Sequence, residues 1–598
     1  MSGSKVEKEP LETTRGTDAG QHTALESLKP LHFILFLTGL FALNLLLRAF
    51  YFRYDFLNGD EGVRALTATR LLEGARLYVD VVTDKPPGAT FFYAAVFAVF
   101  GRSMKALHVI AALWSSLSAV LLFFVTRRAL SVRTALCAAL VLVYFSTNYF
   151  NQDMMAANTE LLLSVPYVAA FLFYWRALEH SRGDEPPGSG SMLFGTAFNS
   201  IASGVMTASA ILFKQTGAFI LIFFVLYETI ILFRARRSGV SIVRVAAAGI
   251  RRLGYLAAGL VATLGFFAGW LITSGAGEGF WHNAIMLNMF YVESESFPSW
   301  LMFLTRRGLS YVLFNAALWI PASISAASAL KPPRRLAGGV MDESREPIRG
   351  ARDKEFLVAV TLWTAVSLAV VLLGGRFFGH YFIPSLPGLS ILAADRLLKW
   401  TDEIKNRRIE TKRAFAFGSV ILLFVFGVVR FHHRTAILAY ETLTGRLTYR
   451  SQQWGMSKRQ QEAEVVSRFV SSRLGPGEPL YIWGYAHDVY WRTGCRPASR
   501  YLTPYYIDGR FPDAEITSAP PRDVFWDEAR THLIEDLYRN RPRMILEVYG
   551  GMRELPYPEI VEFIRSNYAE TGHAGPDPSR PFRVLELKDD VKQNRPAD

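Results

Sequence analysis

Acidic and basic side chains gather in one short segment, residues 58–88, directly after a long apolar stretch. Asp60 and Glu61 lie near its start, and Asp84 and Lys85 lie near its end, within TDKPPG. A positioned carboxylate can take a proton from a hydroxyl group, and a lysine can bind a phosphate. Because two prolines follow Lys85, its backbone is expected to be extended. The segment therefore contains the residue types that group transfer from a phosphate to a hydroxyl requires.

An amphipathic helix is expected between these two pairs, because EGVRALTATRLLEGARL has apolar residues at helical spacing. Val63 and Leu66 lie on its apolar face, and Arg64 lies mostly away from that face. Asp60, near the start of the helix, is either a general base or only the N-cap. Glu61 either positions Asp60 or stabilises the helix dipole.

Further polar residues are expected near the same membrane face. Asp153 and Glu160 flank the outer end of a predicted span, where a carboxylate is costly and is therefore a functional candidate. Lys214 lies in the short turn FKQTG between two spans. His282 is either a metal ligand together with Asp84 or a structural histidine. Asp84 itself either holds a divalent cation or pairs with a base.

Basic residues at the edges of two later spans extend this group. Arg306, Arg307 and Arg376 are predicted to lie on the outer face, where basic residues are unusual. They either bind an anionic ligand or extend their guanidinium groups to lipid headgroups. His380 and Tyr381 follow shortly after Arg376, directly before another span. Acids suit deprotonation of a hydroxyl, and cations suit a departing phosphate.

The composition indicates a membrane protein with many spans. The chain has 598 residues, of which 51% are hydrophobic and only 20% are charged. Its apolar residues form blocks of about 17–25, the length that crosses a bilayer as a helix. The net charge of +13 fits basic cytoplasmic loops better than a nucleic-acid-binding face. The two cysteines, far apart in the chain, support neither a disulfide framework nor a cysteine-based metal site.

The expected fold is an all-α membrane domain with about eleven spans and interfacial helices, followed by a soluble α/β domain. The expected domains are a cytoplasmic tail at residues 1–30, the membrane domain at 31–431 and an extracytoplasmic domain at 432–598. The predicted spans are 31–50, 104–126, 132–149, 157–176, 192–213, 215–234, 253–274, 304–330, 355–374, 382–398 and 414–431. The apolar stretch 88–101 is too short to span comfortably, so it is expected to lie on the outer surface or to re-enter.

The distribution of positive charge predicts the orientation. If 88–101 does not cross, the arginine and lysine clusters at 127–133, 234–252, 331–335 and 396–413 all fall on the cytoplasmic face. The N-terminus is then cytoplasmic and the C-terminal domain extracytoplasmic. We expect the protein to be integral to a membrane, the bacterial inner membrane being the simplest assignment.

The C-terminal region alternates between two kinds of pattern. Helical spacing occurs at 459–474, 527–540 and 558–567, and strand-like runs occur at 479–485, 543–550 and 582–587. We find neither a glycine-rich phosphate loop nor a Ser–His–Asp signature in this region. It is therefore expected to be a lid, a docking module or a stabilising element rather than the seat of chemistry.

The combination of these motifs resembles the GT-C superfamily of membrane glycosyltransferases, most closely the protein O-mannosyltransferase and lipid A aminoarabinose transferase branches. The likeness covers about residues 31–400. It consists of a first span followed by Asp-Glu, LYVD, DKPPG, an aromatic run ending in FG, NTELLLSVPYVAAFLFYWRA, ILFKQTG and GHYFIPSLPGLSILAADRLL.

This resemblance implies a polyprenyl-phosphate-linked sugar as donor and inversion at the anomeric carbon. It implies that Asp60 is the catalytic carboxylate, that Asp153 is a carboxylate of the second outer loop, and that Lys85 contacts the donor phosphate. Asp84 stands where aminoarabinose transferases have a metal-binding Glu, and His282 corresponds to the second ligand. Because this chain has Asp where those transferases have Glu, the resemblance implies no certain cofactor. A divalent metal ion is the alternative. The C-terminal domain differs from the sugar-binding repeats of the mannosyltransferases, which argues against a eukaryotic-type protein mannosyltransferase.

The sequence thus predicts a hexosyl- or pentosyltransferase that moves a sugar from a polyprenyl-phosphate donor to a lipid, glycan or protein hydroxyl on the outer face. The alternative is a transporter or flippase of a lipid-linked or anionic substrate, which would carry polar residues at the midplane of repeated halves. A structural scaffold would leave the loop from Asp60 to Lys85 without a role. The candidate residues are, for catalysis, Asp60, Glu61 and Asp153; for substrate binding, Lys85, Glu160, Lys214, Arg306, Arg307, Arg376, His380 and Tyr381; and for a metal, Asp84 and His282.

Overall fold

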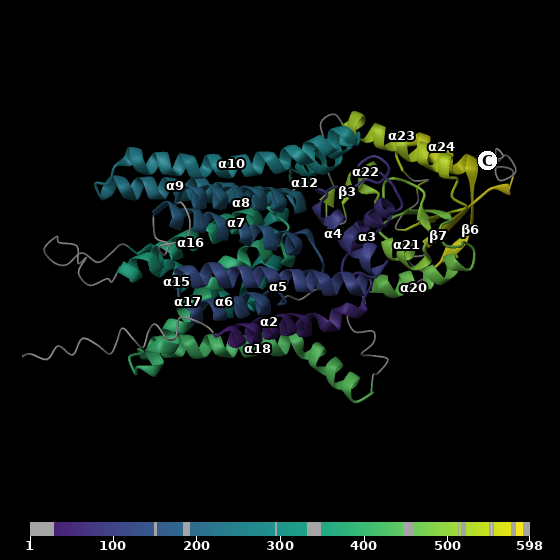
Figure 1. The fold of residues 1–598 in the computed structure, drawn as a ribbon. Helices are drawn as coiled ribbons and strands as arrows, with labels where there is room; N and C mark the ends of the chain where they lie inside the picture. The colour runs from purple at the N-terminus through teal and green to yellow at the C-terminus, as the bar shows by residue number, and fades with distance from the viewer. Residues whose placement is uncertain are drawn as a thin grey trace, which may run out of the picture.

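Long helices lie side by side in one bundle, and a smaller mixed domain lies at one end of it (Figure 1). The structure is a computed structural model. It describes residues 29–148, 152–182, 192–293, 296–331, 348–446, 458–511, 514–515, 522–548, 552, 555–575 and 582–589. The expected cytoplasmic tail, residues 1–30, therefore lies outside the described residues except for its last two.

Eight of the described helices are long and apolar enough to cross a membrane. They are α2 (Pro30–Arg48), α5 (Met104–Ala129), α7 (Thr159–Arg182), α8 (Met192–Phe213), α9 (Ile220–Arg237), α10 (Ile242–Thr273), α16 (Ile348–Gly374) and α18 (Thr411–Leu443). A ninth candidate is bent by 83° at its middle. It comprises α13 (Phe297–Phe303), η5 (Leu304–Gly308), α14 (Leu309–Phe314) and α15 (Ala316–Leu330).

The count of eight or nine is lower than the eleven spans expected, although helices occupy all eleven predicted ranges. The two that fall short are α6 (Val132–Phe145) and α17 (Leu386–Lys405). Helix α6 has only 14 residues, and α17 ends in the charged sequence DRLLKWTDEIK. They pack against each other inside the bundle. Neither helix is long and apolar enough to count as a membrane span by itself, so contacts with other helices hold both of them in the bundle.

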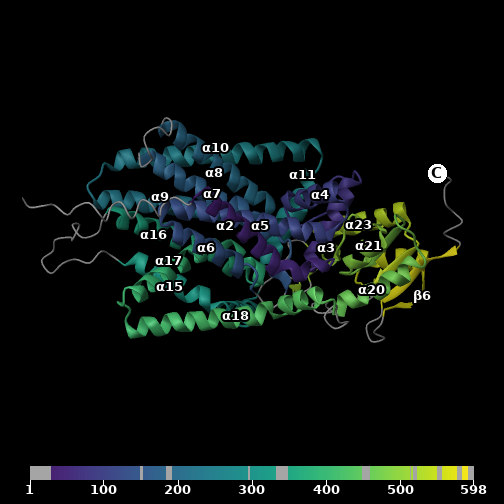
Figure 2. The same ribbon diagram turned by 60° about the horizontal axis from the view of Figure 1, so that its bottom comes forward.

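Short elements connect the long helices. They are η1 (Ala49–Arg53), α3 (Gly59–Leu72), α4 (Gly88–Phe100), η2 (Gln152–Met154), η3 (Gln215–Phe219), α11 (Gly277–Phe280), η4 (Trp281–Met286), α12 (Leu287–Glu293) and η6 (Gly379–Ser385). In both ribbon views α3 and α4 lie at the end of the bundle that faces the mixed domain (Figures 1 and 2). The apolar stretch at 88–101 forms the 13-residue helix α4.

The C-terminal domain is built on a five-stranded mixed sheet, which confirms the expected α/β class. Its strand order is β2 (Arg496–Pro497), β1 (Pro479–Trp483), β5 (Met544–Glu547), β7 (Phe582–Leu587) and β6 (Tyr568–Ala574). Strand β1 is parallel to β2 and β5, and β7 is antiparallel to β5 and β6. A separate pair joins β3 (Arg510–Phe511) and β4 (Ala514–Glu515). The remaining helices are α20 (Lys458–Ser471), α21 (His487–Thr493), α22 (Tyr505–Asp508), α23 (Arg522–Asn540) and α24 (Pro558–Asn567).

Alternate residues of β1 enter two different cores, because successive side chains of a strand point to opposite faces. Leu480 and Ile482 pack with α20 and α21, whereas Tyr481 and Trp483 pack with α23 and α24. Both cores continue into the loops of the membrane domain. The first includes Leu66, Leu77 and Val81, and the second includes Val82, Leu287 and Phe290. The C-terminal domain is therefore docked by continuous apolar packing.

Helix α3 differs from the amphipathic surface helix expected from its sequence. Arg64 was expected to point away from the apolar face, but it is only 4% exposed. Helix α21 packs directly on α3. Gly62 makes this approach possible, because a Cβ atom at that position would lie 2.6 Å from Cβ of His487. The helix is thus enclosed between the membrane domain and the C-terminal domain.

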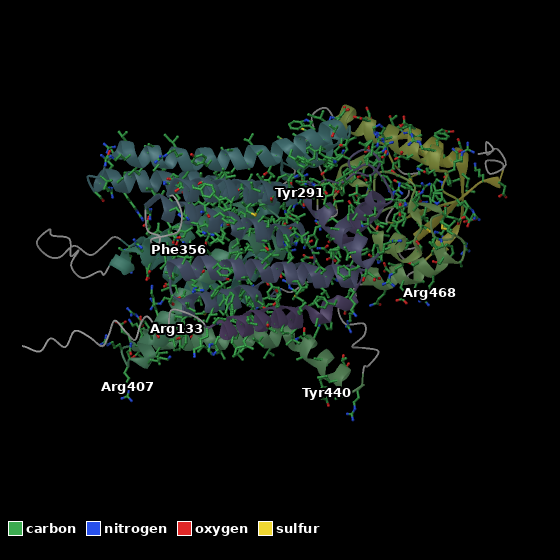
Figure 3. All side chains as sticks on the ribbon, in the orientation of Figure 1. Arg133, Tyr291, Phe356, Arg407, Tyr440 and Arg468 are labelled. Atoms are coloured by element: carbon green, nitrogen blue, oxygen red, sulfur yellow. The ribbon has the colours of Figure 1, made fainter. Side chains whose placement is uncertain are left out.

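The long helices place two basic positions at the far end of the bundle. Arg133 and Arg407 lie at the end opposite the C-terminal domain, which carries Arg468 (Figure 3).

Helix α18 continues to Leu443. The expected domain boundary at 431/432 therefore falls inside this helix rather than after it.

Candidate active site

A cavity of about 330 Å³ lies where the membrane domain meets the C-terminal domain. Segments that are far apart in the sequence contribute to its wall: α3, the loop before α4, the start of α7, the turn before η3, α12 and η6. The structure brings eight of the predicted site residues to this one cavity. They are Asp60, Asp84, Lys85, Asp153, Glu160, Lys214, His380 and Tyr381.

Asp60 faces the cavity from the first turn of α3. Its side chain is 57% exposed, and Arg64, one turn later, lies 2.9 Å from its Oδ2. Burial in the surrounding protein raises the pKa of Asp60, but Arg64, with Lys85 and His380, outweighs burial and holds that pKa below its usual value. The N-cap of α3 is Asn58, whose Oδ1 accepts a hydrogen bond from the backbone of Glu61 at 3.0 Å. The N-cap of α3 is therefore Asn58 and not Asp60, which excludes the capping alternative for Asp60.

Glu61 points away from the cavity, so it corrects the expectation of a catalytic carboxylate. Its side chain is fully buried. Oε2 accepts a hydrogen bond from the backbone N–H of Leu57 at 2.7 Å, and Oε1 accepts one from Ala157 at 2.6 Å. Nε2 of His108 lies 3.0 Å from Oε1. Because these partners occupy both oxygens, Glu61 is a positioning residue that joins the start of α3 to the loop before α7.

Lys85 is held firmly in the wall of the cavity. Its Nζ lies 2.6 Å from Oδ2 of Asp84 and 3.1 Å from Oδ1 of Asn288, on α12. Its carbonyl oxygen accepts a hydrogen bond from the hydroxyl of Tyr78 at 2.8 Å. Burial alone lowers the pKa of Lys85, but the Asp84 carboxylate more than offsets this and raises it. The ammonium group is therefore charged at neutral pH.

A second group of charges lies across the cavity. Nζ of Lys214 donates to Oε1 of Glu160 and lies 4.3 Å from the ring centre of Tyr381. His380 bridges two carboxylates at longer range, with Nε2 3.8 Å from Glu160 and Nδ1 3.9 Å from Asp153. Burial lowers the pKa of Lys214, and the pairing with Glu160 offsets this only in part. Lys85 is therefore the more firmly charged of the two lysines.

The three predicted arginines do not line this cavity. Arg306 is exposed. The guanidinium of Arg307 lies 4.6 Å from the ring centre of Phe378, and that of Arg376 lies 4.5 Å from the ring centre of Tyr291. Phe378 and Tyr291 themselves line the cavity. Arg307 and Arg376 therefore support its aromatic wall from behind, which corrects the expectation of direct contact with a ligand.

The pairing of Asp84 with His282 at one metal ion is wrong. His282 lines a different cavity, where it lies close to Glu278 and Glu528 rather than to Asp84. The cause lies in the fold: η4, which carries His282, leads into α12, and the Asp84–Lys85 turn is contacted by Asn288 of α12. Asp84 is instead the ion-pair partner of Lys85.

Several residues of the site could not be chosen from the sequence alone. Arg64 had a usable signal, because it lies four residues after Asp60 and such pairs are neighbours on a helix. The C-terminal domain, expected to be a lid, a docking module or a stabilising element, adds a further wall to the cavity. Its contributions are Tyr485, His487, Thr503 and Tyr505. These positions carry no sequence signal that links them to a site some 400 residues earlier in the chain.

The profile of the family described as dolichyl-phosphate-mannose-protein mannosyltransferase matches residues 84–250. No curated protein matches the chain. The crystal structure of ArnT from Cupriavidus metallidurans in the apo state is similar, with a TM-score of 0.50 and 12% sequence identity, over 94% of this chain and 99% of that chain.

Two structures of an archaeal oligosaccharyltransferase from Archaeoglobus fulgidus are also similar. The complex with Zn and sulfate has a TM-score of 0.47 and 14% identity, over 92% of this chain and 72% of that chain. The complex of AglB with an inhibitory peptide and a dolichol-phosphate has a TM-score of 0.44 and 12% identity, over 94% and 75%.

The family match at residues 84–250 and the ArnT-like fold confirm the resemblance noted in the sequence. The chain therefore has an ArnT-like fold with several membrane-spanning helices, and its residues 84–250 are similar to the dolichyl-phosphate-mannose-protein mannosyltransferase family. The matched segment begins at Asp84 and includes Lys85, Asp153, Glu160 and Lys214, all of which line the cavity.

Proposed function

We propose that this cavity transfers a sugar from a polyprenyl phosphate to an acceptor hydroxyl on the outer face of the membrane, with inversion at the anomeric carbon. One observation carries the proposal. The carboxylate of Asp60 and the ammonium of Lys85 face one cavity of about 330 Å³. A base for a hydroxyl and a partner for a phosphate are thus available to the same pair of substrates.

In the proposed step Asp60 accepts the proton of the acceptor hydroxyl. The acceptor oxygen forms a bond to the anomeric carbon, and the bond from that carbon to the phosphate oxygen breaks. The bonding electron pair leaves with the polyprenyl phosphate, whose added charge Lys85 offsets. Attack from the face opposite the leaving group inverts the configuration.

The low pKa of Asp60 limits when the proton moves. Arg64, 2.9 Å away, makes the carboxylate a weak base. We infer that the proton leaves late, after the acceptor oxygen has begun to bond and its hydroxyl has become more acidic. Until then Asp60 orients the hydroxyl by accepting its hydrogen bond. Asp153, near His380, is the second candidate carboxylate for this role.

The face of the membrane follows from charge. The cavity lies at the end of the bundle that carries the C-terminal domain, and Arg133 and Arg407 lie at the other end (Figure 3). Basic loops favour the cytoplasmic side. This supports an extracytoplasmic cavity, facing the outer leaflet in which the donor would lie. A lipid, glycan or protein can supply the acceptor hydroxyl.

The decisive experiment is transfer by purified full-length protein with a panel of polyprenyl-phosphate sugars and candidate acceptors. Asp60→Asn should reduce kcat by at least about a hundredfold, in the range of general-base loss, with normal expression and melting. The matched control is Asp80→Asn in the same loop, because Asp80 pairs with Arg76 at the surface and should leave kcat unchanged. Wild-type turnover retained by Asp60→Asn would exclude Asp60 as the base.

A further inference from the structure

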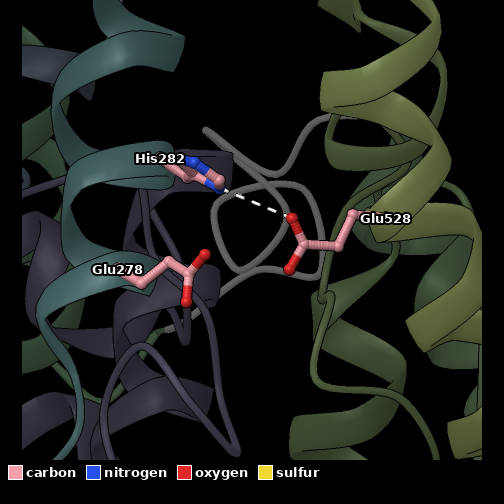
Figure 4. Close-up of side chains that lie close together, drawn as sticks. All are labelled: Glu278, His282 and Glu528. Atoms are coloured by element: carbon pink, nitrogen blue, oxygen red, sulfur yellow. Dashed lines mark ion pairs between the residues drawn. The ribbon is translucent and has the colours of Figure 1, made fainter.

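A second cavity, of about 270 Å³, lies between the membrane domain and the C-terminal domain. Three of its residues bring potential metal-ligating atoms within 4.8 Å of one another: Glu278, His282 and Glu528. Glu278 and His282 lie one turn apart at the α11–η4 junction, and Glu528 projects toward them from α23 (Figure 4). Nδ1 of His282 lies 3.7 Å from Oε2 of Glu528.

We propose that Glu278, His282 and Glu528 bind a divalent transition-metal ion, with Zn²⁺ as the best fit, and that this ion joins the C-terminal domain to the membrane domain. An imidazole nitrogen with carboxylate oxygens is a common zinc ligand set. Two ligands at about 2.1 Å from a tetrahedral ion lie about 3.4 Å apart. The ligand atoms of the cluster therefore need to approach one another by up to about 1.4 Å, which rotation of these partly exposed side chains supplies.

The charges of the cavity favour a cation. Two carboxylates from different domains meet there, and His282 is the histidine of the described cluster. Arg500 also lines the cavity, but its guanidinium makes two hydrogen bonds to Asp536, at 2.9 and 3.0 Å. A bound divalent ion would offset the repulsion between Glu278 and Glu528 directly.

Helix α23 contributes a second histidine to the lining of this cavity. His532 follows Glu528 by one turn and lines the same cavity. Each side of the cluster thus presents a Glu and a His four residues apart. Nδ1 of His532 lies 3.3 Å from the hydroxyl of Tyr501, a contact similar to the outer hydrogen bonds of metal-bound histidines.

The backbone of α11 lies very close to the loop that contains Tyr78. A Cβ atom on Gly279 would lie 2.1 Å from the carbonyl oxygen of Tyr78, so only glycine allows α11 to approach this loop. His282 itself lies in a π-helical segment, a feature often found at functional sites. The segment leads into α12, which carries Asn288 and Tyr291 of the active-site cavity. An ion here would fix both domains beside that cavity.

The test uses the purified full-length protein, stripped with a chelator and then titrated with Zn²⁺ alone. We expect one tightly bound ion per chain by elemental mass spectrometry and a higher melting temperature with zinc than without. Glu528→Gln and His282→Ala should each weaken zinc binding by at least about tenfold. Because these readouts need no sugar donor, they do not depend on the proposed transfer reaction.

Two control variants locate the ion. Glu535→Gln changes an exposed carboxylate on the same helix and should keep the zinc content of the wild type. Asp84→Asn should keep it too, because Asp84 lies in the other cavity. Loss of zinc in Asp84→Asn but not in Glu528→Gln would overturn the proposal, and so would a wild-type chain that binds no zinc. If His282→Ala melts early without metal, Glu278→Gln tests the same site.

Discussion

At the scale of single residues, the active-site cavity balances charge rather than accumulating one sign. Each of its lysines faces a carboxylate, Lys85 facing Asp84 and Lys214 facing Glu160. Asp60 is paired with Arg64. A donor phosphate entering this cavity meets cations whose positions are already fixed by their partners. Such preorganisation avoids the cost of reorienting charges during the reaction.

The Asp60–Arg64 pair gives a prediction about pH. Arg64→Gln removes the largest positive influence that lowers the pKa of Asp60 and leaves Lys85 and His380 to oppose burial, so that pKa rises. The acidic limb of the kcat/KM profile should therefore move to higher pH. The profile is measured between pH 4 and 8, with Arg70→Gln as control, because Arg70 pairs with Glu73 on the same helix away from Asp60. An unshifted acidic limb in Arg64→Gln would separate that limb from Asp60.

At the scale of elements, helix α3 is anchored by the buried carboxylate of Glu61. Burial raises the pKa of Glu61, but His108 and the two backbone N–H groups outweigh burial and lower it below 4.5. A group with a lowered pKa stabilises the fold fully above its unfolded value, and this stability is lost as the pH falls through the folded value. The charged form of Glu61 is therefore part of the folded structure at neutral pH.

We expect Glu61→Gln to lower the free energy of unfolding by about 1.5–3 kcal/mol at pH 7, the usual contribution of hydrogen bonds to a charged group. The difference from wild type should shrink below about pH 4, where the wild-type carboxylate also becomes protonated. Melting temperatures in detergent across this pH range provide the measurement. Glu73→Gln, which alters an exposed residue after the same helix, should melt like wild type at every pH.

A second prediction at this scale concerns the contact of α3 with α21. Gly62→Ala would place a Cβ atom 2.6 Å from Cβ of His487, so one of the two helices must move. We expect a lower melting temperature and reduced transfer. Gly59→Ala is the control in the same helix, because an added Cβ there meets nothing within 4 Å. His487→Gly in the Gly62→Ala background should restore part of the loss, since it removes the opposing atom.

Which features of the fold and the site can be predicted from the sequence depends on how far apart in the chain the interacting residues lie. The apolar blocks and the strand 582–587 are local patterns, and they were recognised from the residues themselves. Asp60 and Lys85 were placed near each other because a short loop joins them. The contact of Glu61 with Ala157, and the position of His282 beside Glu528, depend on how distant segments pack, which no local pattern encodes. The wall supplied by Tyr485 and its neighbours was missed for the same reason.

At the scale of the whole molecule, the C-terminal domain forms part of the wall of the candidate active-site cavity. It shares two apolar cores with the loops of the membrane domain. Tyr485 and Tyr505 both line the cavity, with ring centres 6.5 Å apart and an interplanar angle of 23°. Nearly parallel aromatic rings in the same cavity as Asp84 and Lys85 offer an apolar surface for a sugar or acceptor. The membrane domain supplies the charges, and the C-terminal domain supplies this surface.

This division predicts which kinetic constant the C-terminal domain controls. Tyr485→Ala removes a ring from the surface and leaves Asp60 and Lys85 in place. We expect the acceptor KM to rise by about two- to tenfold, the value of about 0.5–1.5 kcal/mol for an aromatic contact, while kcat changes little. Tyr538→Ala, at a tyrosine that is 55% exposed on α23, serves as the control. If Tyr485→Ala instead lowered kcat at an unchanged KM, this wall would act on the reacting atoms, and the assignment of acceptor binding to the C-terminal domain would be wrong.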